Sequence, residues 1–283
     1  MTSDEVDLNG LRPADLPALS TLLGTVRVAP DQPPLRVRDL VHAPMRSGAL
    51  FDGATHAELL YLRPPMPLPD VSGLPSFPLP APDEKLGAPL DETIEERRSR
   101  HHFGPSPMSC ATLSTLLHHA AGLRGYQPAY NTRTYPFRRA PSEGGLAPVD
   151  LLMVANDVSG LPQGLYLYDP ADHAMAQLDR GNMRGKLTEV APYASWLFSA
   201  HAVFLMVCDM SRVEWKYGTR GYRFVHVDVG VLTQNLYLVG TALNLTTCAV
   251  AAFDDEATCE FARLDGRERF VSLLFACGPP PGS

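Results

Sequence analysis

The sequence predicts an α+β fold in which helices flank a mixed β-sheet. Apolar runs of strand length alternate irregularly with helical patterns, in the order ααββαβααβαβ. The run over residues 202–209 is apolar throughout, which predicts a strand that is buried on both faces. Apolar residues recur at three- and four-residue steps over residues 224–242, which predicts one long central helix.

This long helix is expected to lie in the core or at a dimer interface. Its recurring apolar positions are Phe224, Val227, Val231, Leu232, Leu238, Val239 and Ala242. Only a few residues interrupt the opposite side, namely Gln234, Asn235, Tyr237 and Gly240. A helix that is apolar nearly all round is buried, either inside one domain or between subunits.

Two helices are expected before the sheet begins. Residues 91–99 place acidic side chains first and basic side chains last, an order that suits the helix dipole. Ser109 is an N-cap candidate for a second helix, which Gly122 ends. A loop-rich segment over residues 124–148 follows.

The remaining elements are strands of the sheet and helices that pack on it. In chain order they are expected at residues 149–155 (strand), 164–169 (strand), 181–199 (one or two helices), 246–253 (strand), 255–262 (short helix) and 270–276 (strand). A turn over residues 160–164 separates the first two strands. Asp254 or Asp255 is expected to cap the short helix.

Residues 1–86 differ in composition from the rest of the chain. Proline is dense there, and proline disfavours long helices and central strands. The pattern allows short helices near residues 13–23 and 54–60. Residues 63–82 read as an extended arm laid over a surface, because apolar side chains are interleaved with the prolines. We therefore expect a proline-rich arm or accessory region over 1–86 and one main domain over 87–283.

Composition excludes several classes of protein. The chain of 283 residues carries a net charge of -7 and has a pI of about 5.7, which argues against general binding to nucleic acid. We find no apolar stretch long enough to span a membrane and no signal peptide at the acidic N-terminus. A cytoplasmic location is the resulting expectation.

Metal binding is also not expected. The five cysteines are widely spaced and never form a C-x-x-C pair, so neither a disulfide framework nor a zinc site is indicated. The histidine pairs 101–102 and 118–119 lack the i, i+4 spacing that places two imidazoles on one helix face.

Two short motifs have the chemistry to bind a ligand. Arg97 and Ser99 offer a guanidinium and a hydroxyl to a phosphate or a polar ring edge. Residues 142–145 (SEGG) form a glycine-containing loop whose backbone N–H groups can approach a ligand closely. The alternatives are a solvated basic helix end and a plain turn. Neither a P-loop nor a G-x-G-x-x-G motif occurs, so a nucleoside triphosphate site and a Rossmann fold are unsupported.

Lys216 and Tyr217, close to Arg220, are the sharpest local feature. A lysine acts as a base only when it is neutral, and burial or a neighbouring cation favours that form. Consecutive helical side chains point about 100° apart, so both reach one site only if the backbone turns there. Gly218 permits such a turn. The alternative is a helix-terminal lysine in solvent with the tyrosine packed beneath it.

Six short motifs stand out together along the chain, at residues 97–103 (RRSRHHF), 141–148 (PSEGGLAP), 164–170 (GLYLYDP), 215–223 (WKYGTRGYR), 234–238 (QNLYL) and 253–255 (FDD). Together they resemble the nitroreductase superfamily of FMN-dependent enzymes. Within the superfamily they are most similar to the SagB-type (McbC-like) azoline dehydrogenases. The resemblance covers about 70% of the chain, from residue 86 onward, and leaves the N-terminal region unmatched.

The resemblance implies FMN bound at the interface of a homodimer, with both subunits lining each flavin. The positions that match cofactor contacts are Arg97, Arg98, Ser99, His101, Ser142, Gly144, Gly145, Ala251 and Ala252. Lys216 and Tyr217 match the pair that is essential for azoline oxidation, and Arg220 or Arg223 would tune the lysine or hold the substrate.

Three positions depart from the pattern of the family. His101 stands where the family has a lysine or arginine, Ala251-Ala252 replaces a glycine pair, and Ala147 replaces a tyrosine. These differences concern the details of the flavin contacts.

The resemblance further implies that the protein oxidises thiazolines and oxazolines to thiazoles and oxazoles on a peptide or carrier-bound peptide, with oxygen as the acceptor. A cyclodehydratase or carrier protein is an expected partner. Two alternatives remain open. One is a different flavin enzyme, either an NAD(P)H-dependent reductase or a peptide Cα–Cβ dehydrogenase. The other is a non-catalytic scaffold subunit of a peptide-modifying complex.

Overall fold

One seven-stranded sheet organises the protein in a computed structural model that describes residues 64–282. The strands, in spatial order, are β1 (Ser76–Pro78), β8 (Ala174–Arg180), β7 (Gly164–Asp169), β5 (Val149–Ala155), β9 (Ala202–Asp209), β11 (Arg269–Gly278) and β10 (Thr246–Val250). Every neighbouring pair is antiparallel, which corrects the expectation of a mixed main sheet. The connections from β5 to β7 (residues 156–163) and from β7 to β8 (residues 170–173) are too short for the crossover that parallel neighbours require.

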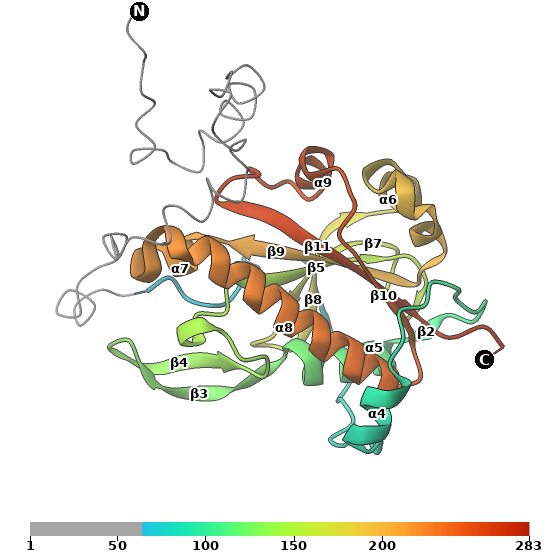
Figure 1. Ribbon diagram of the computed structural model, residues 1–283, viewed down its shortest axis with the longest axis horizontal. Helices are drawn as coiled ribbons and strands as arrows, with labels where there is room; N and C mark the ends of the chain where they lie inside the picture. The colour runs from blue at the N-terminus through green and yellow to red at the C-terminus, as the bar shows by residue number, and fades with distance from the viewer. Residues whose placement is uncertain (1–63, 283) are drawn as a thin grey trace, which may run out of the picture.

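Helices cover both faces of this sheet (Figure 1). They are α4 (Leu90–Glu96), α5 (Cys110–Ala121), α6 (Arg184–Val190), α7 (Ser211–Tyr217), α8 (Gly221–Ala242) and α9 (Asp255–Phe261), with 3-10 turns η4 (Glu143–Gly145), η5 (Pro192–Ser199) and η6 (Gly218–Arg220). One apolar cluster joins α5 and α8 to the first face, and another joins α6, η5 and α9 to the second. The α+β class is thus confirmed, with three layers.

The predicted helix caps are confirmed. The Ser109 hydroxyl accepts a hydrogen bond from the Thr112 N–H at 3.0 Å at the start of α5, which ends at Gly122. The Asp254 carboxylate accepts from the Ala257 N–H at 2.9 Å at the start of α9. Each cap satisfies a backbone donor that the first helical turn leaves unpaired.

Part of the segment predicted to be a loop is a hairpin instead. Strands β3 (Leu123–Ala129) and β4 (Thr132–Arg138) pair with each other as a separate two-stranded sheet, drawn below α8 in Figure 1. The sequence lacks the Asn-Gly or Asp-Gly signal of such hairpins, so the two-residue turn between them was not recognised. Strand β8 was also missed, and a second small pair joins β2 (Met108–Ser109) to β6 (Val158–Ser159).

The long helix α8 determines where the site lies. Its 22 residues extend about 33 Å across the sheet. Lys216 and Tyr217 precede it at the end of α7, and the chain turns at Gly218, whose φ is 53°. The predicted turn is therefore present. Among residues 64–282, no helix combines the length and apolar character needed to cross a membrane.

The described part of the N-terminal region lies on the domain. Strand β1 adds to the edge of the sheet beside β8, and Leu79 is buried. Val71 and Leu74 pack against the apolar cluster under α6 and α9. These contacts agree with an arm laid over a surface, whereas the predicted helices near residues 13–23 and 54–60 fall outside the described residues.

Candidate functional site

The loop over residues 142–147 is fixed to α8 by one buried carboxylate. The Ser142 hydroxyl donates to Asp228 Oδ2 at 2.6 Å, and the Glu143 N–H donates to Oδ1 at 3.3 Å. The Ser142 oxygen in turn accepts from the Ala147 N–H at 2.8 Å. Asp228 is only 6% exposed, so the loop rests on the helix through a shielded anion.

The environment of Asp228 shifts its titration toward neutral pH. Burial raises the pKa of this carboxyl to about 6, although the hydrogen bonds from Ser142 and Glu143 favour the charged form and oppose the shift. The negative charge of Glu143 adds to the increase in pKa. The anchor of the loop therefore changes charge within the range where enzymes are commonly assayed.

Three proton-active groups converge on Gly144. A Cβ atom built on this glycine would lie 2.6 Å from the Tyr217 hydroxyl and 2.9 Å from both Lys216 Nζ and the Tyr130 hydroxyl. The φ of Gly144 is 63°, a conformation that other residues adopt at a cost. The backbone of Gly144 can therefore approach this cluster only because its side chain is absent.

Lys216 and Tyr130 form the centre of the cluster. Lys216 Nζ donates to Tyr130 Oη at 2.8 Å, and Tyr130 Oη donates to the Gly144 carbonyl at 2.5 Å. The Lys216 nitrogen also lies 4.9 Å from the centroid of the Tyr130 ring and 5.0 Å from that of Tyr217. Tyr130 was not among the predicted site residues, because the segment that contains it was interpreted as a loop.

The predicted phosphate contacts gather near the other end of α8. Ser99 Oγ lies 2.9 Å from Tyr237 Oη, and the Arg97 guanidinium stacks over the Tyr237 ring at 5.3 Å. Tyr237 Oη also accepts from the Ala249 N–H of β10 at 2.7 Å. The Arg100 N–H donates to the Thr247 carbonyl at 2.8 Å, which holds this segment against β10.

The other predicted cofactor-binding residues near this end of α8 make different contacts. The Arg98 guanidinium turns back and donates to the carbonyls of Glu95 and Arg97. The His101 ring lies 5.2 Å from the Trp196 ring. Ala251 and Ala252 directly follow β10 and are exposed. The Arg98 side chain thus uses part of its hydrogen-bonding capacity on carbonyls at the end of its own helix.

Within a single copy of the chain, the predicted cofactor-binding residues do not all lie close together. Asp228 contacts the glycine loop and Tyr237 contacts Ser99, and these two helix positions are nine residues, or about 14 Å, apart along α8. Gly145 stays with the first group and packs against Phe137. The candidate residues therefore form two separate groups, one at each end of the helix.

A groove of about 370 Å³ adjoins the first group. It lies between the β3–β4 hairpin and the glycine loop, and it includes Ser142 and Gly145 in its lining. Three arginines, Arg124, Arg138 and Arg139, line it with no acidic side chain among its lining residues. Because Arg138 also pairs with Asp150, the charge of Arg124 and Arg139 is what favours ligands with negative charge or carbonyl oxygens.

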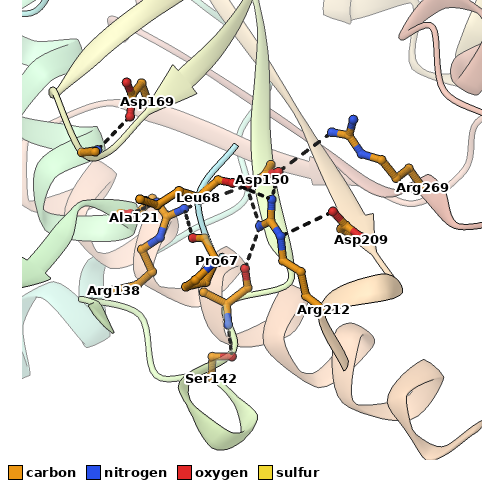
Figure 2. Close-up of polar contacts among 12 residues, drawn as sticks. Pro67, Leu68, Ala121, Arg138, Ser142, Asp150, Asp169, Asp209, Arg212 and Arg269 are labelled. Atoms are coloured by element: carbon orange, nitrogen blue, oxygen red, sulfur yellow. Dashed lines mark hydrogen bonds and ion pairs between the residues drawn. The ribbon is translucent and has the colours of Figure 1, made fainter. Parts of the chain in front are cut away.

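A buried ionic network lies beneath the groove (Figure 2). Arg212 donates to both oxygens of Asp150 at 2.9 and 2.7 Å and to the Ala147 carbonyl at 3.0 Å. Arg138 lies 3.9 Å from the same carboxylate. Burial lowers the pKa of Arg138 to about 10, and Asp150 limits that decrease. Both arginines thus remain charged at neutral pH.

The network also holds the N-terminal arm. Arg138 Nη2 donates to the Pro67 carbonyl at 2.9 Å, and Arg212 Nη2 donates to the Leu68 carbonyl at 3.3 Å. Figure 2 shows the arm, the loop after Ser142 and the sheet meeting at these two guanidinium groups. In the described part of the chain, no group of three or more histidine, cysteine, aspartate or glutamate side chains is placed to hold a metal ion.

Comparison with known proteins assigns the fold to a family. A family model described as the nitroreductase family matches residues 94–278, which is more than half of the chain. The chain belongs to the nitroreductase family. The protein MJ1384 of Methanocaldococcus jannaschii, named for the same family, is 30% identical over 189 residues, which are 67% of this chain and 90% of that protein.

Solved structures of this family share the fold. A nitroreductase-family structure from Ralstonia eutropha has a TM-score of 0.61 at 23% identity and covers 78% of this chain and 96% of that one. One from Anabaena variabilis has the same TM-score at 24% identity, but the match spans 74% of this chain and only 42% of the Anabaena chain. A chain of the E. coli microcin synthetase McbBCD complex, solved with truncated pro-MccB17 bound, has a TM-score of 0.54 at 16% identity and covers 98% of both chains.

Membership in the nitroreductase family makes this protein a flavin oxidoreductase. The residues present fit a phosphorylated flavin, because the half-buried Arg97 and the exposed Ser99 and Arg100 form a group of donors beside β10. The two glycines open no space for the ring on the side where a Cβ atom would lie, because Tyr217, Lys216 and Tyr130 fill that side at Gly144 and Phe137 fills it at Gly145.

Proposed function

We propose that this protein is an FMN-dependent dehydrogenase that oxidises thiazoline and oxazoline rings of peptides to thiazoles and oxazoles. The observation that carries the proposal is the convergence of Lys216 and Tyr217 on Gly144. Oxidation of a ring carbon requires a base beside a hydride acceptor, and a lysine–tyrosine pair at a flavin loop supplies one. The structural likeness to a chain of a complex with a bound pro-peptide supports a peptide substrate.

The reaction removes one proton and one hydride from adjacent ring carbons and leaves a new double bond. Bound FMN would accept the hydride and pass the electron pair to oxygen. Within the protein, either Lys216 or Tyr217 takes the proton, and the other group stabilises the charge that develops on the ring. Arg220 or Arg223, which follow the pair in the chain, would hold the peptide.

Two copies of the chain are proposed to build each cofactor site. One copy would supply the residues that bind the phosphate of the cofactor, namely Arg97, Ser99 and His101. The other copy would supply the glycine loop. The separation of these groups along α8 supports this arrangement. The exposed apolar side chains of Tyr222 and Val227 on α8, 42% and 48% accessible, also suit burial against a second copy.

The arginine-lined groove is proposed to hold the peptide that flanks the ring. It shares Ser142 and Gly145 with the loop that faces Lys216, so a peptide in the groove could present a ring to the cluster. A cyclodehydratase or a carrier protein would deliver that peptide, since an azoline must be formed before it is oxidised.

The proposal is tested with purified protein, an azoline-containing peptide and oxygen. We expect a flavin spectrum, and product that has lost two hydrogen atoms by mass spectrometry. Lys216→Ala and Tyr217→Phe should retain the flavin and lose about a hundredfold or more in kcat, because they remove the base or its partner. Lys186→Ala, an exposed lysine on α6, is the matched control and should keep normal activity.

Other outcomes would replace the proposal. Normal oxidation by both Lys216→Ala and Tyr217→Phe would remove these residues from the mechanism. Rapid bleaching of the flavin by NADPH, without azoline oxidation, would show a reductase. A colourless protein that takes up no added FMN would indicate a scaffold subunit.

A further inference from the structure

The turn of the β3–β4 hairpin has an unusual residue at its first position. Tyr130 and Asn131 connect the paired residues Ala129 and Thr132, and their φ values are 50° and 56°. Two-residue turns with two positive φ angles favour asparagine, aspartate and glycine, because a larger side chain crowds the backbone. A tyrosine there is strained, and such strain persists where the surrounding structure requires it.

The surrounding structure holds the Tyr130 ring over the cluster at Gly144. The ring centroid lies 5.1 Å from that of Tyr135 and 5.7 Å from that of Trp215. The Trp215 indole is fixed in turn, because its Nε1 donates to the Arg212 carbonyl at 2.8 Å. A side chain at a hairpin tip commonly extends into solvent, but this one is placed against the helix that ends at Tyr217.

The directions of the two hydrogen bonds on Tyr130 are determined by chemistry. The Gly144 carbonyl can only accept, so it receives the single phenolic proton. The phenol oxygen then has only lone pairs to offer to Lys216, which must direct an N–H toward it.

We propose that Tyr130 is a positioning residue that fixes the orientation of the Lys216 amine. The phenol accepts one N–H and is itself anchored by the Gly144 carbonyl, so the amine is held at the glycine loop. The importance of this orientation for catalysis rests on the function proposed above. The orientation itself is a property of the chain and can be measured without any substrate.

Tyr130→Phe tests the proposal in the full-length, FMN-loaded protein. This variant keeps the ring and removes only the hydroxyl, and Tyr126→Phe removes an exposed phenol from the same hairpin as a matched control. Lys216 is labelled with an amine-acylating reagent and quantified by peptide mass spectrometry. We expect roughly fivefold faster labelling in Tyr130→Phe, the equivalent of one hydrogen bond, and no change in Tyr126→Phe.

Activity gives the second readout. With an azoline peptide, kcat of Tyr130→Phe should fall about tenfold or more while KM stays constant, because binding is intact and the base is misplaced. Equal labelling of Lys216 in all three proteins would overturn the proposal, and so would full kcat in Tyr130→Phe. A wild-type protein that oxidises no azoline would refute the proposed function only, since labelling still shows whether Tyr130 holds Lys216.

Discussion

At the scale of a single residue, Asp228 makes the charge of the carboxyl that anchors the loop depend on pH. The carboxylate receives the Ser142 hydroxyl and the Glu143 N–H, and it is buried within α8. Its ionised form binds these donors strongly but is poorly solvated, whereas its protonated form is better tolerated in the interior. A pKa of about 6 places the balance between these two states close to neutral pH.

The free energy of unfolding should depend on pH less strongly in Asp228→Asn than in wild type. The pKa of Asp228 is raised from 3.8 to about 6 on folding, so its stabilising contribution is complete below pH 3.8 and is lost as the pH rises through 6. The difference in unfolding free energy between wild type and Asp228→Asn should therefore fall by up to about 3 kcal/mol over that range. Denaturant titrations at several pH values measure it.

Ser142→Ala provides the companion measurement for Asp228. The Ser142 hydrogen bond favours the ionised carboxylate, so its removal should raise the pKa of Asp228 further. The pH at which half of the stabilising contribution of Asp228 is lost should therefore be higher in Ser142→Ala than in wild type. A difference between wild type and Asp228→Asn that does not change between pH 4 and 7 would contradict the raised pKa.

At the scale of elements, the glycine loop η4 depends on Gly144. Gly144→Ala places a methyl group among the ends of Tyr217, Lys216 and Tyr130 and strains a positive φ. Because the contacted atoms end flexible side chains, we expect a loss of stability of only about 1 kcal/mol. Displacement of Lys216 should lower azoline oxidation at least tenfold.

Gly185→Ala is the matched control for this loop. Gly185 lies in α6, and a Cβ atom there would meet nothing within 4 Å. Stability and activity of this variant should equal or exceed those of wild type, because alanine favours a helix. If Gly144→Ala is as active as Gly185→Ala, the activity does not depend on the close approach of the cluster to Gly144.

The elements with strong local signals were predictable from the sequence. The bounds of β5, β7 and β9 match the predicted strands, because uninterrupted apolar runs identify buried strands. The helix α5 was recognised from its cap at Ser109 and its stop at Gly122. The β3–β4 hairpin was missed since it carries polar and proline residues and a tyrosine at its turn. Its contacts with the loop and α7, made through Tyr130, join segments that are far apart in sequence.

The candidate site could be predicted only in part for the same reason. Lys216 and Tyr217 are adjacent in the chain and were named as a pair from the sequence, and both reach Gly144 in the structure. Tyr130 and Asp228 contact Lys216 and Ser142 from 86 residues away in each case, and no spacing rule links residues at that distance. The catalytic roles of all these residues remain predictions.

At the scale of the whole molecule, Arg212 connects parts of the chain that are far apart in sequence. It bonds Asp150 in β5, the Ala147 carbonyl after the glycine loop and the Leu68 carbonyl of the arm (Figure 2). Burial alone would lower the pKa of Arg212, but the carboxylates of Asp150 and Asp209 raise it overall, so the charge is retained. One side chain thus links the sheet, the candidate site and the N-terminal arm.

Arg212→Met should therefore destabilise the protein and release the arm together. The variant leaves Asp150 buried with only the more distant Arg138 and Arg269, each 3.9 Å away, and removal of one partner of a buried ion pair costs about 3–5 kcal/mol. Denaturant unfolding measures the loss, and limited proteolysis should cut near residues 64–75 sooner. The matched control is Arg263→Met, which breaks the exposed pair with Asp179 at 2.8 Å and should cost less than about 1 kcal/mol. If both variants lose the same stability and the arm stays protected, Arg212 does not hold these parts together.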